Sequence, residues 1–125
     1  MTPPEIIRAH AKNQGLDEST LSGQIHDFLL NPKTQVFQQN DCLFLIKNED
    51  DVGFFYILNG GNATGYIRAL RLFVAMMKKL GYRKIAMRVQ DQDQSAKIAK
   101  SAGVNSISYK TVGGENDPYL MIMKV

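Results

Sequence analysis

Residues 51–65 read DVGFFYILNGGNATG, and this stretch decides the fold. The nearly continuous apolar and aromatic run Val52–Leu58 predicts a central strand that is covered on both faces. The polar and glycine-rich segment Asn59–Gly65 ends that strand, and a long helix is predicted from about Thr64 to Leu80. A strand that enters glycines and then a helix N-terminus points several backbone N–H groups in one direction. Such a loop can hold an anion, and pyrophosphates are its usual occupants.

The chain after this helix predicts a second strand, a short helix and two final strands. Arg83–Val89 alternates in the manner of a strand, and a strand joined to another by a long helix implies a right-handed crossover and a parallel pair. Small apolar residues at helical spacing predict a helix over Ser95–Ala102. Ser106–Lys110 and Tyr119–Val125 are expected to be strands on either side of a glycine-rich loop. The last strand could pair with a second chain or be covered within its own domain.

The chain before the glycine loop predicts two helices and two strands. Apolar periodicity and capping residues indicate helices from Pro4 to about Asn13 and from Asp17 or Ser19 to a stop at Asn31–Pro32. Thr34–Gln39 and Cys42–Lys47 then read as strands, which form a three-strand antiparallel meander with Val52–Leu58. The expected fold class is therefore α/β with a mixed sheet, in one domain over residues 1–125.

Composition narrows the function classes. The 125 residues are 44% hydrophobic and carry a formal net charge of +3. The single cysteine, Cys42, excludes an intramolecular disulfide and is expected to be a buried, inert thiol. With His10 and His26 expected on exposed helix positions, no zinc-binding spacing is present and no metal site is expected. A signal-peptide pattern and an apolar run long enough to span a bilayer are both absent, so a soluble, cytoplasmic protein without a membrane partner is expected.

Basic residues gather around the long predicted helix. The favoured interpretation of these residues is a solvated helix surface rather than a phosphate-binding track, so a nucleic-acid partner is not expected. A nucleic-acid-binding regulator remains the third alternative, and it would show a steep fall in affinity with salt. The residues concerned are Arg68, Arg71, Lys78, Lys79, Arg83 and Lys84.

Two further stretches carry a resemblance. Residues 76–89 (MMKKLGYRKIAMRV) resemble the helix end, Gly-Tyr turn and following strand of the GNAT-family N-acetyltransferases, and residues 95–104 (SAKIAKSAGV) resemble the helix that ends in that family's Gly-Phe. The order of the predicted elements is also similar to that of the family over nearly the whole chain. The resemblance implies a GNAT-like fold, in which two helices and a three-strand meander precede the glycine loop, a helix, a strand, a helix and two strands.

The resemblance implies acetyl-CoA or another acyl-CoA as cofactor. In the family, backbone N–H groups of the glycine loop hold the pyrophosphate, and the strand before the loop pairs with the pantetheine arm. This sequence departs from the family's loop pattern, because Gly60 stands where a Gln or Arg is usual and Ala63 replaces the middle glycine. The cofactor-binding residues implied here are Ile57, Leu58, Gly60, Gly61, Asn62, Ala63, Thr64 and Gly65.

The catalytic groups of the family are not where the resemblance would place them. The family often uses a Tyr acid four residues before the terminal Gly-Phe, and here that position is Ala99. The family's general base is often a Glu on the central strand, and Val52–Leu58 contains no carboxylate. By residue type, Tyr56 is the candidate catalytic acid, although an aromatic in a central strand is usually part of the core. Tyr66, Asp91 and Asp93 could line the same cleft.

Two functions follow from the resemblance. The first is an acyl-CoA-dependent N-acyltransferase that acts on an amine of a small molecule or a protein. The second is a catalytically inactive GNAT-like protein that serves as a structural or interaction component, for example of a phage particle or a larger complex, with protein partners. The missing motif residues leave open whether the chain is an enzyme.

Overall fold

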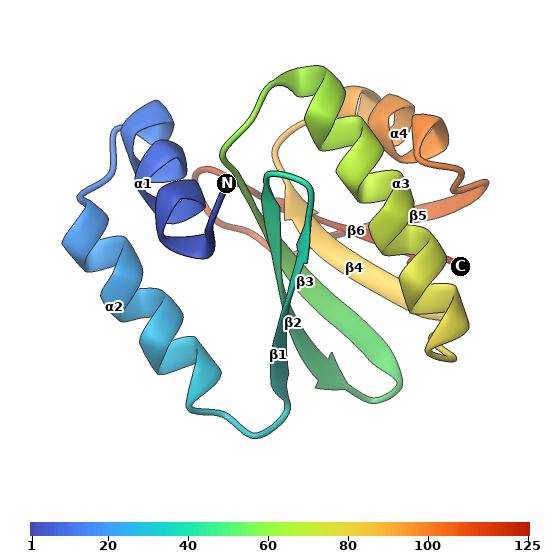
Figure 1. The fold of residues 1–125 in the computed structure, drawn as a ribbon. Helices are drawn as coiled ribbons and strands as arrows, with labels where there is room; N and C mark the ends of the chain where they lie inside the picture. Colours follow the sequence, from blue (N-terminus) through green and yellow to red (C-terminus); the bar gives the residue numbers. More distant parts are fainter.

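The computed structural model describes residues 1–125, which form a six-strand mixed sheet with two helices on each face (Figure 1). The strand order is β1-β2-β3-β4-β6-β5. The elements along the chain are α1 Pro3–Gln14, α2 Glu18–Leu29, β1 Thr34–Gln39, β2 Cys42–Glu49, β3 Val52–Asn59, α3 Ala63–Lys79, β4 Lys84–Val89, α4 Gln92–Ser101, β5 Ser106–Thr111 and β6 Tyr119–Lys124. This is the α/β architecture that the sequence predicts.

Each helix is preceded by an N-cap residue whose side chain accepts a hydrogen bond from a backbone N–H in the first turn of the helix. Thr2 does this for α1 within a capping box, and Asp17, Asn62 and Asp91 do it for the other three helices. Such caps satisfy N–H groups that have no acceptor inside the helix. The cap at Asp91 starts α4 at Gln92, so the predicted start at Ser95 was three residues late.

The sheet separates at its centre. β1, β2 and β3 form the predicted antiparallel meander, and β3 and β4 are the predicted parallel pair. That pair is hydrogen-bonded only from Val52 opposite Lys84 to Phe54 opposite Ala86. Beyond Phe54 the two strands diverge, which leaves a gap in the middle of the sheet, called here the splay.

The last strand is an internal strand of the sheet. β6 is antiparallel to β4 on one side and to β5 on the other. Its two edges are therefore both paired, and the possibility that it joins a second chain through a free edge is wrong. The edge strands are β1 and β5.

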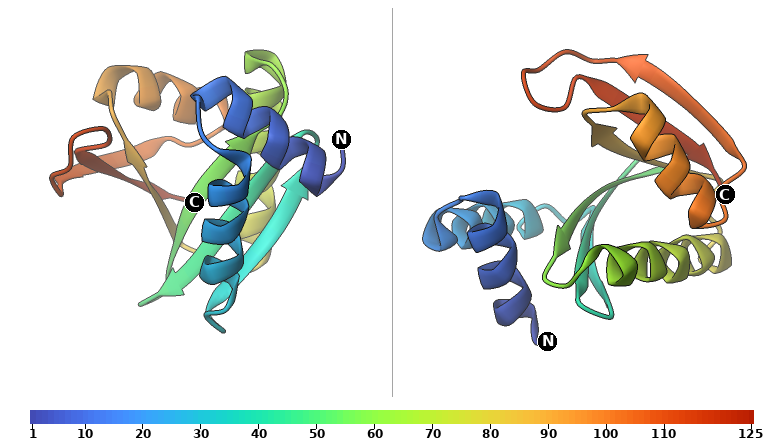
Figure 2. Two further views of the ribbon diagram at one scale, coloured as in Figure 1. Left: turned by 90° about the vertical axis from the view of Figure 1, so that its left-hand side faces the viewer. Right: turned by 90° about the horizontal axis from the view of Figure 1, so that it is seen from above.

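The molecule has three layers (Figure 2), with α1 and α2 on one face of the sheet and α3 and α4 on the other. The larger core lies under α3 and α4. Its centre is a group of three phenylalanines, in which Phe44 stacks on Phe73 at 4.1 Å between ring centroids and Phe55 lies 4.9 Å from Phe73. A smaller core of four buried residues joins α1 to the opposite face of the meander.

None of the helices combines the length and the apolar character that crossing a bilayer requires.

Candidate active site

A cleft opens between α3, α4 and β4 on one side of the splay. Its volume is about 250 Å³, and its walls are mostly apolar with polar groups along the α4 side. α3 contributes Tyr66 and Leu70, while β4 and β6 contribute the floor with Met87 and Met121. The remaining lining residues are Arg88, Val89, Gln90, Asp91, Gln94, Ser95 and Ile98. A cleft with apolar walls and a few convergent polar groups is typical of a ligand-binding site.

A second hollow lies on the other face of the sheet. It has a volume of about 340 Å³ and is lined by Tyr56 of β3, Arg88 of β4 and residues 114–117 of the β5–β6 loop. A narrow slot of about 20 Å³ lies in the splay itself, where Phe54, Tyr56, Met87 and Arg88 are among its lining residues. Tyr56 borders the slot and the second hollow, and Met87 borders the slot and the cleft. The splay is thus hollow on both faces of the sheet.

Tyr56 is solvent-exposed. Its exposed fraction is 53%, so the expectation that it belongs to the core is wrong. Residues alternate in direction along β3, so that Phe55 is buried under α3 while Tyr56 lies on the α1–α2 face. The ring meets that of Phe28 of α2 edge to face, with 6.0 Å between centroids. The phenolic hydroxyl has no hydrogen-bond partner within the chain, which leaves it available to a ligand.

Arg88 holds the β5–β6 loop against the second hollow. Its Nε and one terminal nitrogen donate to the carbonyl oxygen of Asp117 at 3.0 and 2.9 Å, and the same nitrogen donates to the carbonyl of Gly113. The loop turns through Gly113 and Gly114, whose φ angles of 78° and 111° are accessible mainly to glycine. Sequence reasoning missed Arg88. The alternation of Arg83–Val89 put it on the face opposite Met87, but nothing local linked it to a distant loop.

The glycine loop leads into α3 as predicted. Asn62 accepts a hydrogen bond from the Gly65 N–H at 2.8 Å, and the Gly61 N–H donates to the side chain of Asn59 at 2.9 Å. The N–H groups of Ala63 and Thr64, at the first two helical positions, have no acceptor within the chain. These two donors, the Asn62 N–H, which also has no acceptor within the chain, and the positive end of the α3 dipole form the part of the loop that is free to bind an anion.

The charges around these amides are mixed. Thr64, Gly65 and Arg68 border a hollow of about 540 Å³ together with Asp41 of the β1–β2 turn. The Arg68 side chain has no carboxylate partner and would favour an anion, whereas the Asp41 carboxylate would oppose one. Because the Asp41 carboxylate is paired with the N-terminal ammonium of Met1 at 3.0 Å, the Arg68 charge still leaves this helix end attractive to an anion.

Gly60 has a packing role. A Cβ on Gly60 would lie 3.1 Å from Cα of Ile6 and 3.3 Å from the Asp41 carbonyl oxygen, so glycine lets the loop pass close to α1. The Gly60 N–H already donates to that carbonyl at 2.8 Å. Of the implied strand residues, Leu58 is buried against α1 and Ile57 is partly buried against the larger core. Leu58 could therefore offer a ligand only its backbone.

The structure separates the three other candidate residues. Tyr66 and Asp91 both line the cleft, but Asp93 does not. Burial, with a smaller contribution from Cys42, raises the pKa of Tyr66 to about 12, and its hydroxyl has no hydrogen-bond partner within the chain. Asp91 is engaged as the cap of α4, accepting from the Gln94 N–H at 2.9 Å. Ala99 is completely buried, so no side chain from that position reaches the cleft.

His10 is half-buried, and the expectation that it is exposed is wrong. Its Nδ1 accepts a hydrogen bond from the Asn59 N–H at 3.1 Å. Burial lowers the pKa of His10 below its ordinary value. His26 is exposed on α2, as expected.

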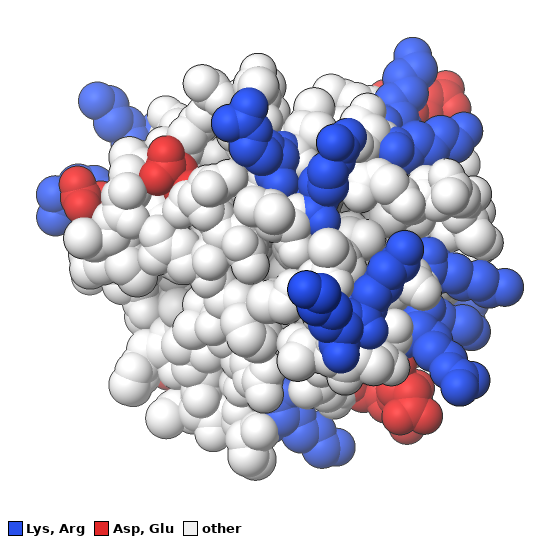
Figure 3. All heavy atoms as spheres, turned by 45° about the vertical axis from the view of Figure 1, so that its right-hand side comes forward, with Lys and Arg blue, Asp and Glu red and all other residues white.

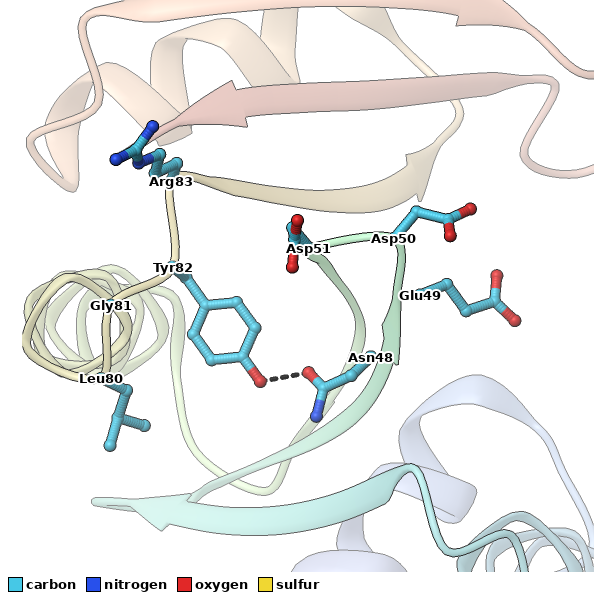
Figure 4. Close-up of a pocket in the computed structure, with 8 residues that line it drawn as sticks. All are labelled: Asn48, Glu49, Asp50, Asp51, Leu80, Gly81, Tyr82 and Arg83. Atoms are coloured by element: carbon cyan, nitrogen blue, oxygen red, sulfur yellow. Dashed lines mark hydrogen bonds between the residues drawn. The ribbon is translucent and has the colours of Figure 1, made fainter.

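The far end of the sheet holds another hollow (Figure 4), formed by the β2–β3 turn and the α3–β4 turn, with a volume of about 530 Å³. The Tyr82 hydroxyl reaches across it to the Asn48 side chain. The carboxylates of Asp50 and Glu49 point outward rather than toward a shared centre. Nowhere in the chain do three His, Cys, Asp or Glu residues lie where they could hold a metal ion together. This hollow lies at the opposite end of the sheet from the glycine loop.

Comparisons with known proteins identify the fold. The sequence matches no family model and no curated protein. Among solved structures, a chimera of the spermidine N-acetyltransferase SpeG from Vibrio cholerae and hSSAT has a TM-score of 0.59, with 12% identity over 99% of this chain and 91% of that one. The N-acetyltransferase PseH of Campylobacter jejuni, solved with acetyl coenzyme A, has a TM-score of 0.56, with 12% identity over 99% of this chain and 92% of that one.

A third match, the ribosomal-protein-S18-alanine N-acetyltransferase of Escherichia coli, has a TM-score of 0.54, with 15% identity over 87% of this chain and 76% of that one. All three are N-acetyltransferases, and the chain has the GNAT-like mixed α/β fold that the resemblance implied. At 12–15% identity the likeness shows the fold alone.

Proposed function

We propose that this chain binds an acyl-CoA at the splay and transfers the acyl group to an amine. The observation that carries the proposal is that the splay has hollows on both faces, with the slot between them. A donor on the α3–α4 side and an acceptor on the α1–α2 side could then meet at the slot. The fold, shared with N-acetyltransferases, supports the same proposal.

The acyl-CoA is proposed to lie in the cleft, with its pyrophosphate over the N-terminus of α3. The free N–H groups of Ala63 and Thr64 would donate to phosphate oxygens, and the Arg68 guanidinium would add charge. The unpaired edge of β3 beyond Phe54 would accept hydrogen bonds from, and donate them to, the amides of the pantetheine arm. Apolar walls such as Leu70 and Met121 suit its carbon chain.

Acyl transfer from a thioester to an amine requires one proton donor for the leaving thiolate. A neutral amine attacks the thioester carbonyl carbon, the tetrahedral intermediate collapses with cleavage of the C–S bond, and the thiolate takes up a proton. Tyr56 is proposed as that acid, because its hydroxyl is unpartnered and borders both the slot and the acceptor hollow. The proton lost by the amine passes to solvent at the acceptor hollow.

Binding is tested by thermal shift with acetyl-CoA. A ligand at a hundred times its dissociation constant adds about 2.7 kcal/mol to the free energy of unfolding, so a clear rise in Tm is expected. Proline fits the first helical position, and Asn62 before it is already extended. Ala63→Pro should therefore remove one phosphate donor while α3 stays intact, and the shift should shrink. Gly61→Val and Gly65→Val should abolish it. An unchanged shift in all three variants would place the site elsewhere.

Transfer is tested by release of free thiol from acetyl-CoA with a panel of polyamines and peptide amines. Tyr56→Phe is expected to lose transfer while keeping the acetyl-CoA thermal shift. Tyr82→Phe removes a hydroxyl at the far end of the sheet and serves as the control, with transfer retained. Full transfer by Tyr56→Phe would eliminate Tyr56 as the acid, and no Tm shift with any acyl-CoA would eliminate the enzyme proposal itself.

The second candidate function, an inactive GNAT-like interaction component, is favoured by one observation. The buried Ala99 offers no acid from α4. On this alternative, acetyl-CoA either gives no Tm shift or gives a shift without transfer to any amine of the panel.

A further inference from the structure

A basic face covers α3 and α4. It consists of Arg68, Arg71, Lys78 and Lys79 on α3 and of Lys97 and Lys100 on α4. All six are exposed, and none has a carboxylate partner. The 17 residues of α3 include no Asp or Glu. Figure 3 shows the result, with Lys and Arg alone in the centre of this view and acidic residues confined to its margins.

The fold creates this face by placing two helices side by side. The Arg71 guanidinium donates to the carbonyl oxygen of Ser101 at 2.6 Å, which joins the middle of α3 to the C-terminal end of α4. The lysines of α4 thereby extend the basic row of α3. The sequence showed the cations of α3 and of the turn after it but could not show that α4 adds to them.

The net charge of the chain conceals this asymmetry. The face holds six of the 15 Lys and Arg residues, so the remaining nine are outnumbered by the 12 Asp and Glu residues. A weakly basic protein with evenly spread charge would attract polyanions equally on all sides. Here the attraction is concentrated on one face.

We infer that this face binds the phosphate backbone of a double-stranded nucleic acid without reading its sequence. From Arg68 to Lys79 the helix rises about 16 Å, which is the length of roughly five base pairs. No exposed aromatic lies on the face to stack on unpaired bases, which argues against a single strand. Leu72 is the one exposed large apolar side chain within α3, which is too little for the apolar centre of a protein interface.

The test is fluorescence anisotropy with a labelled 20-base-pair DNA duplex between 50 and 200 mM NaCl. Binding is expected at the low-salt end, with an affinity that falls steeply as salt rises. In the variant Lys78→Gln, Lys79→Gln, Lys97→Gln and Lys100→Gln, affinity at 50 mM should fall at least about tenfold. The slope of log Kd against log salt should decrease by up to about 0.9 for each lost contact. Arg68 and Arg71 are left unchanged because they contribute to the proposed anion site and to helix packing.

The matched control removes four charges elsewhere, through Lys12→Gln, Lys33→Gln, Lys84→Gln and Lys110→Gln, all at exposed positions. It should bind the duplex within about twofold of the unaltered chain, with an unchanged slope. If both variants lost the same affinity for the duplex, the loss would be explained by net charge alone, and the inference would be overturned. An absence of binding at 50 mM NaCl would also overturn it. Tighter binding to polyglutamate than to the duplex would do the same, because it would indicate an acidic protein partner.

Discussion

The backbone N–H of Asn59 donates to Nδ1 of His10 across 3.1 Å, which ties the end of β3 to α1. The bond requires an unprotonated Nδ1, so His10 is neutral with its proton on Nε2. It lies directly before the glycine loop, and the position of that loop therefore depends on the charge state of a residue nearly fifty positions earlier.

Acid should destabilise the chain through His10. Burial lowers the pKa of His10 in the folded state below 6.5, whereas the unfolded chain keeps the ordinary value. The unfolded state therefore binds the proton first, and stability falls as pH drops from about 6.5 through the folded pKa. Urea unfolding at pH 7.5 and 5.0 should show this loss, and His10→Gln should reduce it. His26→Gln, at an exposed position, should leave it intact, and an equal response of both variants would contradict the assignment.

Cys42 should be unreactive in the folded chain. It is 1% exposed, and burial together with the neighbouring Asp41 raises its pKa to about 11. At pH 8 only about one thiol in a thousand is then ionised, and the thiolate is the reactive form. Titration with Ellman's reagent should be slow without denaturant and complete within minutes in guanidinium. Ala75→Cys, at an exposed position of α3, provides a thiol that should react at once. Fast labelling of the native Cys42 would show that β2 is accessible to solvent in the folded chain.

Gly60→Ala should destabilise the fold. The new Cβ would meet the backbone of Ile6 at 3.1 Å, and overpacking of this kind costs about 1–3 kcal/mol. Gly23→Ala is the matched control, because a Cβ there meets nothing within 4 Å and alanine favours the interior of α2 by roughly 0.5–1 kcal/mol. Chemical denaturation should move the two variants in opposite directions. A neutral Gly60→Ala would mean that the loop is not held against α1.

Lys124→Glu should stabilise the sheet. Lys84 and Lys124 are directly opposite each other on β4 and β6, and like charges in that position are unfavourable. An opposite-charge pair should gain about 0.2–1 kcal/mol, and the gain should shrink in 1 M NaCl because both side chains are exposed. Lys110 lies opposite the uncharged Leu120 on β6, so Lys110→Glu should show no such gain. A gain of equal size at both positions would point to net charge instead.

The elements could be predicted from the sequence because their signals are local. Caps, apolar periodicity and glycine stops lie within a few residues of each helix or strand, and the parallel β3–β4 pair followed from the long connecting helix. The insertion of β6 between β4 and β5 could not be predicted, since it depends on pairing between strands far apart in the chain. The same holds for Arg88 and the β5–β6 loop, and for His10 and Asn59.

The candidate site was predictable in part. The order of strand, glycine loop and helix indicated where an anion could bind. Only the hydrogen bonds of the folded chain show that the free donors are the N–H groups of residues 62–64 rather than those of Gly60 and Gly61. The residue type of Tyr56 suggested an acid, while its exposure depended on how α1 and α2 cover the sheet.

The short pairing of β3 with β4 divides the sheet into two halves of three strands, called leaves here. Only three residue pairs join the leaf made of β1, β2 and β3 to the leaf made of β4, β6 and β5 by strand pairing, and the rest of the contact between the leaves is side-chain packing under α3 and α4. The backbone pairing therefore lies at one end of the sheet, and the other end is open. A ligand bound at the open end would contact both β3 and β4 where these strands are not hydrogen-bonded to each other. Its binding should therefore slow amide hydrogen exchange in both leaves at once.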